Sequence, residues 1–266
     1  DATNKTITLS GNFSFPTAGR AILWGSSGTF VHNGTGWNID ADYSGFSPDF
    51  KNLTLSGSGS KTLFANLNIG GDIVIQNGVT LTMGTFLITG TGGIFNLQGG
   101  ATLNSAILSG SGVAFPTGFS SYSLNQTSTV NLNGAGAQTI ASNPTYGNLN
   151  LNNSSNSTIQ AGSDLNIAGN FSTNASTLID NNRNINFSGS SMDIRSYTPS
   201  PGTTLTLNGG SQTINDLSGG ALDIQNITFS NTGIKLVSNG ANNIININGN
   251  LSITAGVTVT VNNRTI

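Results

Sequence analysis

Short segments in which apolar and polar residues alternate recur along the whole chain. Two of them are Asn148-Leu149-Asn150-Leu151 and Thr204-Leu205-Thr206-Leu207, and each is followed by an Asn. Alternation of this kind, interrupted by Gly, Asn and Ser, is typical of short strands with one buried face and tight turns between them. The pattern therefore predicts an all-β chain made of many short strands.

The strands belong to an internal repeat. Residues 71–82 return as residues 249–260 at a constant offset of 178 positions (249 − 71), with no gap. A weaker copy begins at Gly169-Asn170, and a fourth start lies at Gly11-Asn12. A repeat of this kind predicts an elongated array whose core is built between neighbouring units.

Three larger copies contain the same series of motifs. Each copy opens with a strand that ends in Asn-Gly, continues with an Asn-apolar-x-apolar strand, and closes with Gly followed by Asp or Asn. We expect one continuous solenoid over residues 1–266, with no separate domains. Its predicted parts are an N-terminal partial coil at 1–28 and three copies at about 29–128, 129–203 and 204–266.

Within a copy, the strand motifs recur about every 20 residues, as at Leu205, Ile227 and Ile247. This spacing is close to one coil of a parallel β-helix, or β-solenoid, and we expect a right-handed one. Inward Ile, Leu, Val and Phe would form ladders, outward Asn and Thr would form hydrogen-bonded rows, and Gly and Asn would form the corners. The alternative is a string of immunoglobulin-like sandwiches, which the 20-residue period argues against.

Composition supports strands and excludes several classes of function. The chain has no Glu, so all ten acids are Asp, and the residues that favour helices are scarce, which predicts little or no helix. The eight Lys and Arg are scattered and the net charge is −2, which argues against nucleic-acid binding. No apolar run approaches the ~20 residues of a membrane helix. The absence of Cys fits a bacterial extracellular protein.

One stretch resembles a known family. Lys51-Asn52-Leu53-Thr54-Leu55-Ser56-Gly57-Ser58-Gly59-Ser60-Lys61-Thr62-Leu63, with Gly71-Asp72-Ile73 and Gly78-Val79-Thr80-Leu81 after it, resembles repeats in large surface adhesins of Bacteroidota. Those adhesins are exported by the type IX system and include gliding-associated adhesins. Autotransporter passengers and filamentous haemagglutinins are similar more loosely. The resemblance implies a secreted or cell-surface location and an adhesive or structural role, and it carries no catalytic residues.

Few residues suggest chemistry. The densest acidic region contains Asp40, Asp42 and Asp49, which are candidate oxygen ligands for calcium, although the simpler interpretation is a solvated loop that carries a few acids. No other cofactor is expected. His32, the sole histidine, stands where other copies carry Leu132 and Leu207, so we interpret it as a substitution at a strand position. One His without Cys does not build a catalytic set.

Aromatic residues crowd the first fifth of the chain. Trp24, Trp37 and Tyr43 are candidate carbohydrate contacts if they are exposed, but we favour burial, in which the rings fill the first coils. The repeat pattern stops at Ile266 without an apparent cap. This favours either a piece of a longer protein or ends that meet other subunits.

The sequence therefore predicts a non-catalytic extracellular rod that acts in adhesion or as a scaffold. Its expected partners are surface glycans or other cell-surface material. One alternative is a filament subunit that stacks head to tail through its solenoid ends. Another is a β-helix enzyme acting on polysaccharides, which would require Asp and Lys or Arg to converge in a cleft. A carbohydrate-binding module is included in this alternative.

Overall fold

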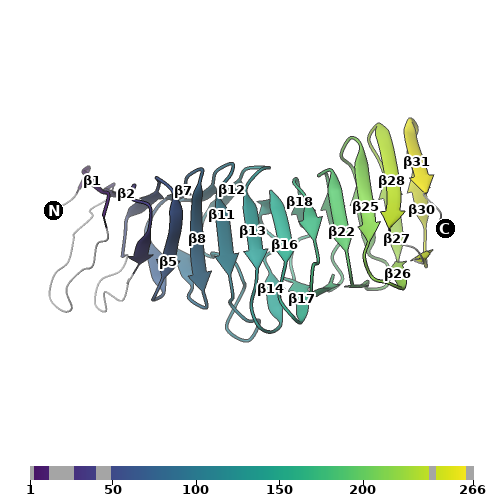
Figure 1. The fold of residues 1–266 in the computed structure, drawn as a ribbon, viewed down its shortest axis with the longest axis horizontal. Coiled ribbons are helices and arrows are strands. Elements are labelled where there is room, and N and C mark those ends of the chain that lie inside the picture. The colour runs from purple at the N-terminus through teal and green to yellow at the C-terminus, as the bar shows by residue number, and fades with distance from the viewer. Residues whose placement is uncertain (1–2, 12–26, 40–48, 240–243, 262–266) are drawn as a thin grey trace.

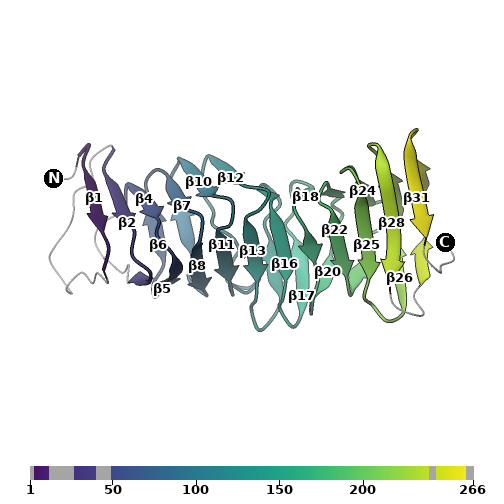
Figure 2. The same cartoon turned by 45° about the horizontal axis from the view of Figure 1, so that its top comes forward.

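The computed structural model describes residues 3–11, 27–39, 49–239 and 244–261. These residues form an all-β parallel solenoid of about 10 turns, with about 22 residues per turn. No helix occurs in these ranges. The turns are stacked along one axis, with strands β1 and β31 at opposite ends of the rod (Figures 1 and 2). The predicted fold class is confirmed, with a turn slightly longer than the expected 20 residues.

The strands lie on three faces, and those on one face pair in parallel with strands of neighbouring turns. The first face consists of two six-stranded sheets that follow one another along the rod. Its strands are β1 (Thr6–Leu9), β2 (Thr29–His32), β4 (Asn52–Leu55), β7 (Ile73–Ile75), β10 (Ile94–Leu97), β12 (Ser121–Leu124), β15 (Thr145–Tyr146), β18 (Leu165–Ile167), β21 (Ile185–Phe187), β24 (Thr204–Leu207), β27 (Asn226–Phe229) and β30 (Leu251–Ile253).

The second face is a single eleven-stranded sheet, which makes the solenoid continuous from β3 to β31. Its strands are β3 (Trp37–Ile39), β5 (Gly59–Leu63), β8 (Val79–Gly84), β11 (Thr102–Ser105), β13 (Thr129–Leu132), β16 (Asn148–Leu151), β19 (Phe171–Ser172), β22 (Ser191–Ile194), β25 (Gln212–Asp216), β28 (Gly233–Asn239) and β31 (Val257–Val261).

The third face consists of three shorter sheets of two, four and two strands. Its strands are β6 (Leu67–Ile69), β9 (Ile88–Gly90), β14 (Gln138–Ile140), β17 (Asn156–Ile159), β20 (Thr177–Ile179), β23 (Tyr197–Thr198), β26 (Ala221–Ile224) and β29 (Ile244–Ile247).

The core lies between the three faces and is made of stacked apolar ladders. On the first face, Leu53, Ile73 and Phe95 are in register on successive turns and are fully buried. Outward positions form the polar rows that the sequence predicts. On the second face, for example, Asn150 Nδ2 donates to Asn131 Oδ1 (2.9 Å), and Asn131 Nδ2 donates to Asn104 Oδ1 (2.8 Å).

The Asn and Gly-Asn motifs of each copy are hydrogen-bonded to one another. Asn148 Oδ1 accepts a hydrogen bond from the backbone N–H of Asn170 on the next turn, at 2.8 Å. The same bond links Asn52 to the N–H of Asp72 at 2.9 Å. In the third copy it links Asn226 to the N–H of Asn250 at 2.8 Å. These side chains therefore join consecutive turns where the second strand motif of a copy meets its closing motif.

This bond also explains why a glycine precedes the closing Asp or Asn. A Cβ on Gly169 would lie 2.7 Å from Asn148 Oδ1 and 2.6 Å from the carbonyl oxygen of Gln126. A Cβ on Gly71 or Gly249 would likewise collide with the Asn side-chain oxygen of the preceding turn. Only glycine leaves room for the amide oxygen at this corner.

The three sequence copies do not all occupy the same faces. The opening strands of the first and third copies are β2 and β24 on the first face, whereas that of the second copy is β13 on the second face. Within a turn, the second copy therefore begins one strand later than the first and third copies. By contrast, the offset of 178 residues runs from β7 to β30, which is eight turns along the first face, so it returns to an equivalent position.

Candidate functional site

The predicted calcium ligands fall partly outside the described residues, because Asp40 and Asp42 lie in the gap at 40–48. Asp49 is described, and its Oδ2 accepts a hydrogen bond from the backbone N–H of Asn68 at 2.7 Å. This contact is the inter-turn bond seen at other corners. Among the described residues, no group of three or more His, Cys, Asp or Glu could hold a metal ion.

The aromatic candidates divide in the same way. Trp24 and Tyr43 lie outside the described residues, whereas Trp37 is buried with 4% of its surface exposed. Its ring stacks on Phe30, with centroids 5.4 Å apart, and on the imidazole of His32, with centroids 4.8 Å apart. Trp37 thus fills the core of the first turns, as the favoured interpretation of these aromatics predicts, and offers no open ring face to a sugar.

His32 occupies a core position on β2. It is fully buried and in register with Leu9 on one side and Leu55 on the other. Its Nε2 lies 3.1 Å from the carbonyl oxygen of Gly11. Burial lowers the pKa of His32; the charge of Lys61 lowers it further, and the Gly11 carbonyl opposes both. The prediction that His32 replaces an apolar strand residue is confirmed.

Two fully buried lysines were missed by sequence reasoning. Nζ of Lys61 donates to the carbonyl oxygens of Gly34 and Ser58. Nζ of Lys235 donates to the carbonyl oxygens of Gly209 and Gly210, both at 2.6 Å. Burial lowers the pKa of both side chains. Each lysine therefore donates at least one hydrogen bond to an Asn-Gly corner of the preceding turn.

The glutamine of the Gln-Thr-Ile motif forms hydrogen bonds with the Asn-Gly corner of its own turn. Gln212 Oε1 accepts from the Gly209 N–H at 3.0 Å, and its Nε2 donates to the Phe187 carbonyl at 2.9 Å. Gln138 is bonded in the same way, with its Oε1 accepting from the Gly134 N–H at 2.9 Å. Both side chains are buried, so the motif is explained by satisfied backbone groups.

A third buried polar cluster surrounds Asp180, at the corner after β20. Its Oδ2 accepts from the Tyr197 hydroxyl and the Thr203 hydroxyl, each at 2.8 Å, and from the Ser200 N–H at 3.0 Å. Burial raises the pKa of Tyr197, and the negative charge of Asp180 raises it further. The carboxylate is enclosed by its donors, so the cluster acts as a structural clamp.

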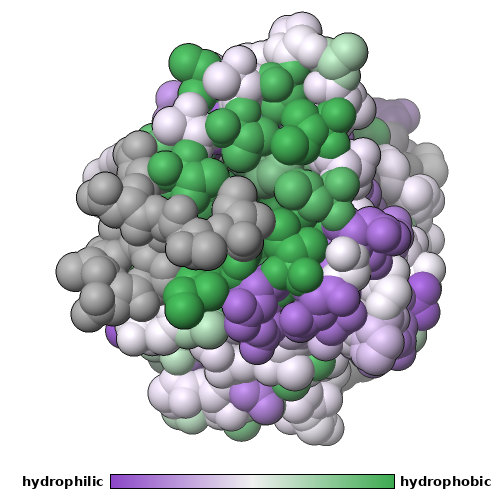
Figure 3. All heavy atoms as spheres, turned by 90° about the vertical axis from the view of Figure 1, so that its right-hand side faces the viewer, coloured by the Kyte–Doolittle hydropathy of each residue, from purple (hydrophilic) through white to green (hydrophobic). Residues whose placement is uncertain are grey.

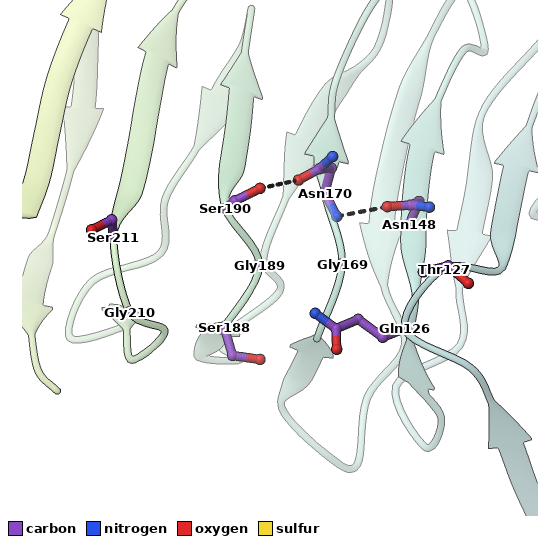
Figure 4. Close-up of a pocket in the computed structure, with 10 residues that line it drawn as sticks. All are labelled: Gln126, Thr127, Asn148, Gly169, Asn170, Ser188, Gly189, Ser190, Gly210 and Ser211. Atoms are coloured by element: carbon purple, nitrogen blue, oxygen red, sulfur yellow. Dashed lines mark hydrogen bonds between the residues drawn. The ribbon is translucent and has the colours of Figure 1, made fainter. Parts of the chain in front are cut away.

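An open groove follows the corner between the first and second faces across five successive turns. It has a volume of about 430 Å³ and is lined by residues 126–127, 148, 169–170, 188–190 and 210–211. In Figure 4 glycines form its floor, and amide and hydroxyl side chains stand along it. Asn170 Oδ1 accepts from the Ser190 hydroxyl at 3.0 Å, which fixes the side chains of adjacent turns relative to one another.

Comparison with family models, with curated proteins and with solved structures gave no match to this chain. Within the described ranges, no helix has the length and apolar character needed to cross a membrane.

Proposed function

We propose that this protein is a non-catalytic, extracellular rod that acts as a scaffold and adheres to other surfaces through its sides. The observation that carries the proposal is the continuous second face, in which eleven parallel strands join all the turns from β3 to β31. Such a body holds groups on its sides at fixed spacing over its whole length. Weak contacts repeated along it add up to avidity.

The buried ionisable groups support a structural role. Lys61, Lys235 and Asp180 are each fully buried. Their polar atoms bind backbone groups or neighbouring side chains at corners of the solenoid, as described above. These side chains therefore stabilise turns, and none of them lines the open groove.

The more specific proposal is a segment of a surface adhesin like those of Bacteroidota, with surface glycans as partners. Its support is the resemblance of residues 51–81 to adhesin repeats, together with side faces that carry rows of Asn, Ser and Thr and few charges. Uncharged amides and hydroxyls suit hydrogen bonding to polyhydroxylated surfaces.

The test has two parts. Small-angle scattering should give a monomeric rod of roughly 50 Å, because about 10 turns stack at ~4.8 Å each. Beads that carry the protein at increasing density should then be retained under flow on polysaccharide-coated surfaces, with a steep dependence on density. A globular scattering profile, the absence of retention at any density, or hydrolysis of the polysaccharide would contradict the proposal.

A second candidate function is head-to-tail assembly, and the C-terminal end favours it. Leu251 and Ile253 on β30 are 44% and 48% exposed, whereas the matching residues Ile73 and Ile75 on β7 are fully buried under the next turn. Figure 3 shows apolar side chains gathered on this end of the rod. The proposed occupant is the first turn of a second copy, because the equivalent surface inside the molecule is covered by a solenoid turn.

Electron microscopy and sedimentation across a concentration series test this candidate. Fibres or oligomers should form in the wild type and disappear in the double variant Leu251→Asp/Ile253→Asp. The matched control is Ile234→Asp, which changes an apolar residue on β28 that is also exposed but lies on the side of the rod. A wild type that stays monomeric at all concentrations, or equal assembly in both variants, would exclude end stacking.

A further inference from the structure

We propose that the groove along the corner between the first and second faces binds a neutral, linear polysaccharide that lies parallel to the rod axis. The inference rests on the proposed adhesive function, because it names the ligand class and the surface for that function. The groove residues are different from Trp24, Trp37 and Tyr43, the carbohydrate contacts expected from sequence.

At Gly169 and Gly189 the floor of the groove is main chain because side chains do not fit there. A Cβ on Gly189 would collide with the carbonyl of Gly169 on the preceding turn. A Cβ on Gly169 would lie 2.6 Å from the carbonyl oxygen of Gln126. Glycines recur at this corner 20 to 22 positions apart (169 − 147, 189 − 169, 209 − 189), and an added Cβ would meet main chain of an earlier turn at each of them, although only Gly169 and Gly189 of these four line the groove. The repetition turns a local close approach into a continuous trough.

The walls offer polar groups that the fold does not use. The Gln126 carboxamide and the Ser211 hydroxyl form no hydrogen bond with any described residue, and both side chains are exposed. In Figure 4 the Gln126 side chain extends toward the segment that contains Gly169, on a later turn. Asn170 has its Oδ1 engaged by the Ser190 hydroxyl, while its Nδ2 donates to no described residue.

The side chains of the two asparagines in the lining, Asn148 and Asn170, are held in place by hydrogen bonds. Asn148 Oδ1 accepts from the Asn170 N–H at 2.8 Å, and Asn170 Oδ1 accepts from both Ser190 and the N–H of Ser191. The asparagine and Ser190 groups are therefore held at fixed positions along the groove, and a ligand needs to order only the Gln126 and Ser211 side chains. Fixed groups of this kind reduce the entropy cost of binding.

The chemistry of the lining selects the ligand class. None of the ten lining residues is charged, so the groove offers no counter-charge to phosphate or carboxylate groups. No aromatic ring is present for stacking, so affinity must come from hydrogen bonds repeated along the ligand. Turns repeat every ~4.8 Å. A chain with hydroxyls along its length can use several turns at once, and affinity should rise with chain length.

An extended polypeptide is the other linear ligand to consider. Peptides commonly bind by adding a strand to a free sheet edge or by placing side chains in apolar pockets. The strands beside this groove are paired on both edges with neighbouring turns, as β19 is with β16 and β22. The lining contains only Gln, Thr, Asn, Ser and Gly residues, and therefore no apolar side-chain pocket. Both features favour a polysaccharide over a peptide.

Affinity electrophoresis tests the proposal with defined probes. Native gels would contain laminarin, dextran, glucomannan or xylan as neutral chains, alginate as an acidic chain, and gelatin as an unfolded polypeptide. At least one neutral chain should retard the wild type, and longer fractions should retard it more than short ones. Alginate should not.

The double variant Gln126→Ala/Ser211→Ala should bind about fivefold more weakly, the loss expected from one net hydrogen bond of ~1 kcal/mol. The matched control is Gln160→Ala/Ser163→Ala, which removes the same groups from the corner between β17 and β18. The control should bind like the wild type. Circular dichroism melts should show all three proteins equally folded.

Three results would overturn the groove proposal: no retardation by any neutral chain, equal retardation of both double variants, or retardation by gelatin alone. The bead assay separates this failure from failure of the adhesive function. If beads with the Gln126→Ala/Ser211→Ala variant are retained like the wild type, adhesion stands and the groove is not its site. If wild-type beads are not retained on any surface, the adhesive function itself fails.

Discussion

Asn148 illustrates how one side chain stabilises two turns at once. Its backbone in β16 pairs with β13 of the preceding turn, while its Oδ1 accepts a hydrogen bond from the N–H of Asn170 on the next turn. Asn and Asp are suited to this position because their short side chains reach a neighbouring backbone group with little loss of rotamer freedom. The same residue types recur at Asn52 and Asn226 for the same reason.

Replacing Asn148 with alanine should lower the free energy of unfolding by about 1 kcal/mol, because the Asn170 N–H loses its partner. Urea unfolding followed by circular dichroism measures the change. Asn68→Ala is the control, since the Asn68 side chain is exposed and makes no hydrogen bond with described residues. A similar loss in both variants would show that the inter-turn bond contributes nothing specific.

Glycine 169 should tolerate no side chain. Gly169→Ala would force its Cβ against Gln126 and Gly147 of the preceding turns, so we expect a loss of about 1–3 kcal/mol from overpacking. Gly220→Ala places its Cβ in open space and should be neutral or slightly stabilising. Thermal melts of the two variants compare them directly, and equal melting temperatures would refute the packing argument.

His32 should make the first turns sensitive to acid. Burial lowers its pKa in the folded state below the ordinary value of 6.5, so below pH 6.5 the unfolded chain takes up a proton more readily than the folded one. Its contribution to stability is therefore complete above pH 6.5 and declines as the pH falls toward the lowered folded-state pKa. Melting temperatures between pH 4 and 8 should decline less on acidification in His32→Leu. Parallel profiles for the two proteins would contradict this.

At the scale of the strand, sequence alternation is a reliable guide. The segments chosen from the pattern, 148–151 and 204–207, coincide with β16 and β24. The face that each strand occupies was not predictable, because strands on all three faces carry the same in–out alternation. This is why the second copy could be aligned with the others and still begin on a different face.

Two features, the buried Lys61 and the groove, could not be predicted from the sequence, because each brings together residues of different turns. Lys61 lies at an inward position of β5, where its charge argues against burial, and one of its two acceptors, the Gly34 carbonyl, belongs to the preceding turn. The groove likewise combines corners from five turns. Its signal in the sequence is the spacing of Gly147, Gly169, Gly189 and Gly209, which is informative only once one knows that these glycines share a corner.

An aspartate at Ile75 should disrupt the strands around β7. Ile75 is fully buried in the ladder between Leu55 and Leu97, so Ile75→Asp leaves an unpaired charge in the core. We expect a loss of about 4 kcal/mol or more. Val74→Asp, one residue earlier and facing outward, should cost far less. Chemical denaturation of the two variants measures both losses in the free energy of unfolding. A larger loss in Val74→Asp than in Ile75→Asp would mean that the ladder assignment is wrong.

At the scale of the whole molecule, each turn contacts mainly its two neighbours. Stability in such an array is approximately the sum of individual turns and the interfaces between them. Hydrogen exchange should therefore be slowest in central strands such as β13 and β16 and become faster toward both ends. Uniform protection from β1 to β31 would instead indicate a single cooperative unit.

The inter-turn bonds of the corner asparagines all run in one direction. In each pair the acceptor is on the earlier turn and the donor is on the later turn, from Asn52 and Asp72 to Asn226 and Asn250. The rod thus has a chemical polarity along its axis, and its two ends are not equivalent. The polarity is confined to these side-chain bonds, because the backbone ladder between the same turns also contains bonds in the opposite sense, such as the one from the Leu149 N–H to the Asn170 carbonyl oxygen. A unit that adds its turns in the same sense would repeat this acceptor-to-donor pairing of the corner side chains at the junction.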